Sequence, residues 1–179
     1  MRTALALVLV AATGVTASAG TYIGVGIGNG ANVSDGINTQ YTANGRSARG
    51  VLGYRIGPFS VEGAYSGYGL VLDGSGLYDS RSLQIAGKYN FAIGDKFELF
   101  GRLGLLRTDL NARDVSNTNS SGDGYTMSLG VEYRLDLVAT GLGIFVDWTR
   151  NSTDQTLDST VTLGTQTASM WTLGVNFAL

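Results

Sequence analysis

The sequence predicts an all-β protein, an eight-stranded antiparallel up-and-down transmembrane β-barrel preceded by a cleavable signal peptide. Two observations predict this fold. Eight segments alternate bulky apolar residues with small or polar ones at a period of two, which gives each strand two unlike faces. The connections are short after the second, fourth and sixth segments and longer and polar after the first, third, fifth and seventh, as in barrels inserted into a membrane.

The N-terminus has the organisation of a secretory signal peptide. Met1-Arg2 precedes an apolar run over 4–12, and Ala17-Ser18-Ala19 forms a small-residue cleavage motif. We therefore expect cleavage after Ala19, with 1–19 as signal peptide and 20–179 as one barrel domain. The apolar run is far shorter than the roughly 18 residues of a membrane-spanning helix. With 0 Cys, the exported chain forms no disulfide.

The composition suits strands and turns and excludes one class of partner. The chain contains 27 Gly, 1 Pro and 15% charged residues, a composition more typical of short strands than of helices. Its formal net charge is -2, and no basic patch is present that would attract nucleic acid. We therefore expect no nucleic-acid partner.

The expected strands follow the alternation along the chain. Gly57-Pro58 and Gly94-Asp95-Lys96 predict tight turns. The polar segment 116–124 is expected to be a loop, and the last nine residues are expected to be the final strand. The segments expected as strands are 21–29, 46–56, 59–68, 80–93, 97–108, 125–135, 142–149 and 171–179.

Alternation alone does not distinguish a membrane barrel from a secreted ligand-binding barrel, which carries its apolar residues inside. Two features favour the membrane. The polar face is rich in Gly, Ala and Ser, which suits the crowded lumen of a small barrel. Aromatic residues of the apolar face gather near strand ends, and the rise from Tyr125 to Tyr133 is about 20 Å, comparable to the ~25 Å apolar band between two aromatic girdles.

Several local patterns resemble a known group of proteins. They are Gly53-Tyr54-Arg55 before a tight turn, the segments 61–65 and 130–133, and the closing Gly174-Val175-Asn176-Phe177. Together they resemble the small outer-membrane barrels grouped with the outer-membrane protein A transmembrane domain, outer-membrane protein X and the opacity surface antigens. The resemblance implies the outer membrane of a Gram-negative bacterium and a C-terminal strand recognised by the barrel insertion machinery. Leu179 departs from the usual terminal Phe.

Ionisable residues on the small-residue face are the candidate site. We expect Glu62, Lys88, Arg102 and Glu132 to meet across the lumen as a plug, because they lie near the middle of four successive strands and their charges balance. A gate or selectivity constriction is the alternative role. A structural role is favoured, because charges enclosed in a narrow lumen must pair or stay hydrated. The full expected set is Arg49, Arg55, Glu62, Lys88, Arg102, Glu132, Arg134 and Asp147.

The sequence contains little that supports catalysis. With 0 His and 0 Cys, the usual proton-transfer base and the thiol nucleophile are both missing, although a paired-carboxylate hydrolase remains formally open. The Gly-rich run 24–30 lacks the Lys-Ser/Thr of a phosphate-binding loop, so close backbone packing is its expected role. Scattered loop aspartates do not make a calcium site. No enzyme activity, metal or cofactor is expected.

These observations predict a monomeric integral outer-membrane barrel with a structural or surface-exposed role, a plugged polar lumen and long extracellular loops. Its expected partners are outer-membrane lipids, and the sequence does not identify an extracellular partner. Two alternatives are a narrow porin-like channel for small solutes, suggested by polar lumen positions, and a loop-mediated adhesin, suggested by the loops.

Overall fold

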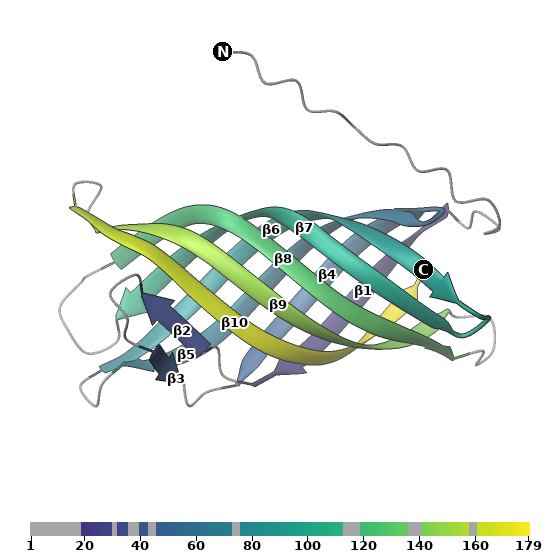
Figure 1. The fold of residues 1–179 in the computed structure, drawn as a ribbon, viewed down its shortest axis with the longest axis horizontal. Helices are drawn as coiled ribbons and strands as arrows, with labels where there is room; N and C mark the ends of the chain where they lie inside the picture. Colours follow the sequence, from purple (N-terminus) through teal and green to yellow (C-terminus); the bar gives the residue numbers. More distant parts are fainter. Residues whose placement is uncertain are drawn as a thin grey trace, which may run out of the picture.

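Eight strands close into a single antiparallel barrel (Figure 1). The computed structural model describes residues 19–29, 32–35, 40–42, 46–72, 76–112, 119–135, 141–157 and 161–179. Apart from Ala19, the expected signal peptide lies outside these residues. The barrel strands are β1 (Ala19–Gly28), β4 (Ser47–Ile56), β5 (Phe59–Leu72), β6 (Gly76–Ile93), β7 (Phe97–Ala112), β8 (Asn119–Leu135), β9 (Leu142–Leu157) and β10 (Val161–Ala178).

Each barrel strand pairs with the next one along the chain, and β1 pairs with β10 to close the ring. This is the predicted up-and-down order. The described residues include no helix that is long and apolar enough to cross a membrane.

The register fixes the tilt of the strands. A row of paired residues that starts at Val175 passes through Val25, Gly50 and the following strands, and it returns to β10 at Thr165, ten residues away. With strands spaced about 4.8 Å apart and a rise of about 3.4 Å per residue, this stagger corresponds to a tilt of about 41°. The tilt lies in the range of small membrane barrels.

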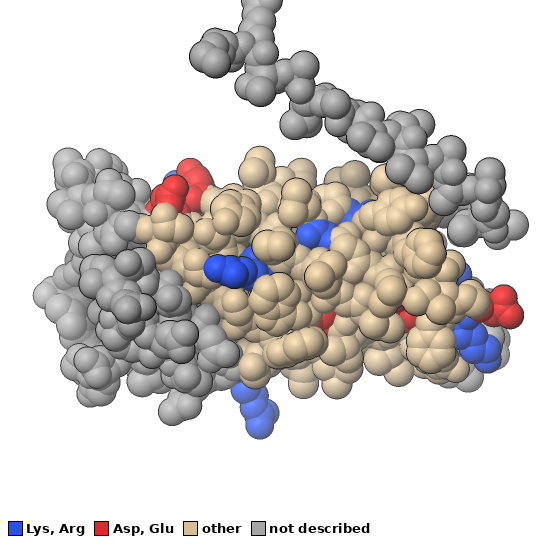
Figure 2. All heavy atoms as spheres, viewed as in Figure 1, with Lys and Arg blue, Asp and Glu red and all other residues tan. Residues whose placement is uncertain are grey.

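The two faces of the wall are confirmed as predicted. Along β7, Leu103 is 69% exposed on the outside, whereas the neighbouring Arg102 is 7% exposed inside. Most large apolar side chains of the barrel face outward in this way, and Figure 2 shows a wall of mostly uncharged residues. Such a surface is the opposite of a water-soluble barrel's exterior and is suited to lipid.

The two predicted tight turns are present at one end of the barrel, here called the turn end. Gly57 and Gly94 adopt positive φ angles of 61° and 66°, which glycine tolerates without steric cost. Backbone hydrogen bonds from Asn90 N to the Pro58 carbonyl oxygen and from Arg134 N to the Lys96 carbonyl oxygen, both 2.7 Å, join neighbouring hairpins there.

Several predicted strand boundaries at the opposite end, here called the hairpin end, were wrong. β8 begins at Asn119 and not at Tyr125, so most of the expected loop 116–124 is strand. β10 begins at Val161 and not at Trp171. These Gly-, Ser- and Thr-rich segments show little apolar alternation, but an adjacent strand satisfies their backbone hydrogen bonds, so the ladder continues. The expected long loops are therefore in large part continued hairpins.

A second correction concerns the first connection, which was expected to be a loop. It contains two short strands, β2 (Asn32–Asp35) and β3 (Gln40–Thr42), which pair with each other. β1 stops pairing with β10 at Thr172, and β2 then pairs with the segment Gln166–Ser169 of β10. The short hairpin thus covers a strand edge that the end of β1 leaves open.

Candidate functional site in the barrel lumen

A continuous chain of polar contacts crosses the middle of the lumen. Tyr22 Oη donates to Glu62 Oε1, and Arg102 Nε donates to Glu62 Oε2 at 2.5 Å. Arg102 Nη1 also donates to Asp147 Oδ2 at 3.0 Å, and the same oxygen accepts from Arg49 Nη2 at 2.6 Å. All five side chains are buried, and Asp147 is 0% exposed. Strands β1, β4, β5, β7 and β9 are therefore linked through their side chains.

Lys88 connects a third carboxylate, that of Glu132, to this chain. Its Nζ lies 3.1 Å from Glu132 Oε2 and 3.6 Å from Glu62 Oε1. Asn176 Nδ2 donates to the same Glu132 oxygen at 3.0 Å. The structure thus brings together Glu62, Lys88, Arg102 and Glu132, the four residues expected to meet, and it adds Asp147 and Arg49. We call these six residues the central network; it contains three acids and three bases, so its formal charges balance.

Two aromatic rings contact the cations of the central network. Lys88 Nζ lies 4.3 Å from the centre of the Phe100 ring, and the Arg102 guanidinium lies 5.4 Å from it. The Arg49 guanidinium lies 5.5 Å from the centre of the Phe145 ring. Ring faces attract cations, so these contacts add to the ion pairs. Neither ring was predicted to lie in the lumen, because aromatic residues are typical of the apolar face of such strands.

A separate ionic cluster lies at the turn end. Arg55 donates to both carboxylate oxygens of Glu98, at 2.9 Å and 2.7 Å, and Arg134 also pairs with Glu98. Arg55 and Arg134 were expected in the lumen, and the structure places them in this cluster and not in the central network. Glu98 was not among the expected residues, although its position opposite Phe97 and Leu99 in the alternation already placed it on the small-residue face.

The lumen towards the hairpin end is lined by uncharged polar groups. Gln84 Nε2 donates to Ser82 Oγ at 3.3 Å, and the hydroxyls of Ser128 and Thr149 are 2.9 Å apart. Among the described residues, no group of three or more His, Cys, Asp or Glu side chains is placed to hold a metal ion. The site is therefore a set of ion pairs with uncharged polar side chains on its hairpin-end side, here called the polar layer. Buried members of the polar layer are Ser47, Ser66, Ser80, Ser82, Gln84, Thr108, Thr126, Ser128 and Thr149.

An apolar outer wall, strands tilted by about 41° and a charged lumen together define a transmembrane β-barrel. A family model described as the outer membrane protein beta-barrel domain matches residues 3–178. The chain belongs to this family. The comparison with curated proteins finds no match.

Solved structures of other barrels are similar in fold. Neisserial surface protein A is 19% identical, with a TM-score of 0.68 over 89% of this chain and 97% of that one. Ail, the attachment invasion locus protein of Yersinia pestis, is 15% identical, with a TM-score of 0.55 over 89% of this chain and 99% of that one. OprG from Pseudomonas aeruginosa is 13% identical, with a TM-score of 0.56 over 90% of this chain and 96% of that one. At these identities, the likeness concerns the fold alone.

Proposed function

We propose that the protein is a monomeric barrel of the Gram-negative outer membrane with a plugged lumen, and that it acts as a structural or surface-exposed protein and not as a channel or an enzyme. The observation that carries the proposal is the central network, which runs through the lumen from Glu62 through Arg102 to Asp147 and Arg49, with Tyr22 donating to Glu62 at one end.

The plug follows from the energetics of enclosed charges. An eight-stranded barrel is only just wide enough for its own side chains. A permeating ion would have to separate buried ion pairs, and leaving one partner of such a pair unpaired costs about 3 to 5 kcal/mol. The balanced formal charge of the central network also provides no net field that favours either sign of ion. A porin-like channel is therefore the weaker alternative.

The proposed orientation follows the usual asymmetry of outer-membrane barrels. The turn end faces the periplasm and the hairpin end faces the outside. In this orientation the polar layer lies towards the extracellular side, and the Arg55–Glu98 cluster lies towards the periplasmic side. Export uses the signal peptide, with cleavage after Ala19.

Planar-bilayer recording tests the plug. We expect the folded wild-type protein to show no reproducible conductance steps, with folding checked by heat-dependent gel mobility. A variant with Glu62→Ala, Arg102→Ala, Asp147→Ala and Arg49→Ala removes two acids and two bases and leaves the Lys88–Glu132 pair, so no remaining member of the network loses its ion partner, and we expect it to conduct. Reproducible steps from folded wild-type protein would overturn the proposal.

Surface binding is a second candidate, supported by the hairpins that continue beyond the predicted strand ends. β6 and β7 remain paired as far as Tyr78 and Ala112, and the β2–β3 hairpin lies against β10 at the same end. These paired strands form a surface outside the membrane to which a partner could bind. Replacing 30–45 by a short Gly-Ser linker should abolish binding to cells or matrix while leaving heat-dependent gel mobility intact. Binding that survives this replacement would exclude the β2–β3 hairpin as the binding element.

A further inference from the structure

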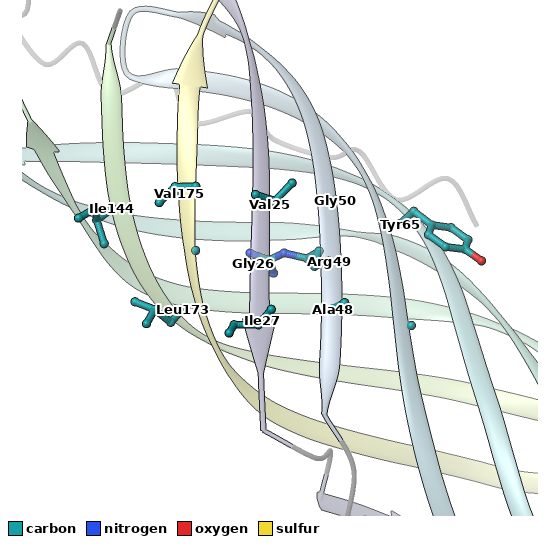
Figure 3. A pocket seen from close by; sticks show the side chains of 12 residues that line it. Val25, Gly26, Ile27, Ala48, Arg49, Gly50, Tyr65, Ile144, Leu173 and Val175 are labelled. Carbon is teal, nitrogen blue, oxygen red and sulfur yellow. The ribbon is translucent and has the colours of Figure 1, made fainter. Parts of the chain in front are cut away.

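The described part of the outer wall contains a hollow over β1, β4, β5 and β10. The hollow has a volume of about 800 Å³, and Figure 3 shows its lining. Ala48 and Gly50 of β4 form its floor, with Tyr65 on one side and the aliphatic side chains of β1 and β10 on the other. Because it lies on the outward face of the barrel, this groove opens to lipid and not to the lumen.

Small residues in consecutive rows of the sheet create the groove. In one row, Gly50 lies between Val25 and Tyr65; in the next, Ala48 lies between Ile27 and Gly67. A Cβ atom built on Gly50 or Gly67 meets nothing within 4 Å, so neither glycine is required by close packing of the wall. The missing side chains therefore leave open space beside large exposed neighbours.

Two arginines lie at the hairpin-end limit of the groove. Arg46 immediately precedes β4. It lies two residues before Ala48 in the sequence and, like Ala48, is exposed on the outward face. Arg81 of β6 is the register partner of Gly67. Both are exposed, and among the described residues no ion pair involves either of them. Asp109 lies opposite Arg81, but on the β7 side away from the groove.

We propose that the groove is a binding site for one phosphorylated lipid of the external leaflet. An acyl chain lies along Ala48 and Gly50 between Ile27 and Tyr65, and Arg46 and Arg81 hold the phosphate. Long arginine side chains on the lipid face carry their charge towards the membrane surface, where anionic headgroups lie. The apolar floor and the two cations thus match the two ends of one amphiphile.

A second copy of the chain fits the groove less well. In a twofold-symmetric contact the same patch meets itself, so two hollows would face each other and two pairs of arginines would approach. Such a contact loses packing and brings like charges together. The lipid fills the hollow and neutralises the arginines.

Quenching of Trp171 by brominated lipid tests the proposal. Trp171 is exposed on β10, two residues from groove-lining Leu173, and Trp148→Phe makes it the single tryptophan. We expect phosphatidic acid brominated on its acyl chains, diluted into phosphatidylcholine vesicles, to quench Trp171 at a mole fraction about 25-fold lower than brominated phosphatidylcholine does. Each of the two arginines should contribute about fivefold to this preference, from its attraction to an anionic membrane surface.

Matched variants separate the two halves of the site. The double variant Arg46→Gln, Arg81→Gln should abolish the preference for phosphatidic acid over phosphatidylcholine. Gly50→Leu, which fills the groove, should at least halve this preference. The controls Arg107→Gln and Gly87→Leu change an outward arginine and an outward glycine outside the groove and should leave it unchanged. The proposal is overturned if the double variant keeps the preference, if Gly50→Leu keeps it, or if the controls lose it equally. A chemically cross-linked dimer that Gly50→Leu removes, without a lipid preference in wild type, would assign the groove to a second copy.

Discussion

Arg102 donates a hydrogen bond to Asp147 inside the lumen at 3.0 Å, and this bond joins β7 to β9, two strands that β8 separates in the sheet. Backbone ladders hold each strand only to its two neighbours. Arg49 of β4 donates to the same Asp147 oxygen, so the contact also reaches a strand three places away in the ring. The stability of the barrel should therefore depend on a few buried charges as well as on its hydrogen-bonded ladders.

Arg102→Ala should lower the free energy of unfolding by about 3 to 5 kcal/mol, because it leaves Glu62 and Asp147 without a main partner in a buried site. Urea unfolding in lipid vesicles measures the loss. Combining it with Glu62→Ala should cost less than the sum of the two single changes, since contacting residues couple. Arg107→Ala, at an exposed position of the same strand, should change stability by no more than about 0.5 kcal/mol. Strictly additive losses would contradict the network.

Asp147→Asn should also be strongly destabilising, by about 3 kcal/mol or more, because Arg49 and Arg102 share its Oδ2 atom and would face each other without a carboxylate. The heat-dependent gel shift gives the change in melting temperature. Adding Arg49→Gln removes one of the two like charges and should restore part of the loss. No recovery in the double variant would show that the two arginines do not repel each other through this site.

Gly53→Ala should destabilise the barrel by about 1 to 3 kcal/mol, as expected for overpacking. A Cβ atom at Gly53 would lie 2.6 Å from Cε1 of the Tyr22 ring. It would therefore displace this ring together with its hydroxyl, which donates to Glu62. Gly50→Ala is the matched control on the same strand, because its Cβ atom points outward and meets nothing within 4 Å. Equal effects of the two changes on the urea midpoint would contradict the assigned faces of β4.

Leu103→Arg should cost about 2 to 4 kcal/mol in vesicles, because this exposed leucine lies on the lipid-facing wall of β7, and a cation near the bilayer midplane loses its hydration. Refolding yield and urea unfolding in vesicles measure the cost. Asp95→Arg, in the exposed turn after β6, should be tolerated. If Leu103→Arg is as stable as the turn variant, the outer face is not in lipid.

Most of the fold was predictable because one physical rule repeats along the chain. Residues such as Val25 and Leu103 alternate with small or polar ones, and a wall between lipid and lumen requires that alternation at every strand. The prediction was wrong at the hairpin end, where Asn119 and Val161 begin strands without apolar alternation. There the neighbouring strand, and not the contrast between lipid and lumen, keeps the backbone extended.

The sequence by itself determined the eight-stranded barrel, its two faces and most of the charged residues that line the lumen, because side-chain direction in a strand depends only on position along the chain. Only the tertiary structure decided which charges pair. The ten-residue stagger around the ring brings Glu62, Arg102 and Asp147 together and places Arg55 beside Glu98. That stagger depends on the register of all eight pairings at once, and no single segment of the chain specifies it.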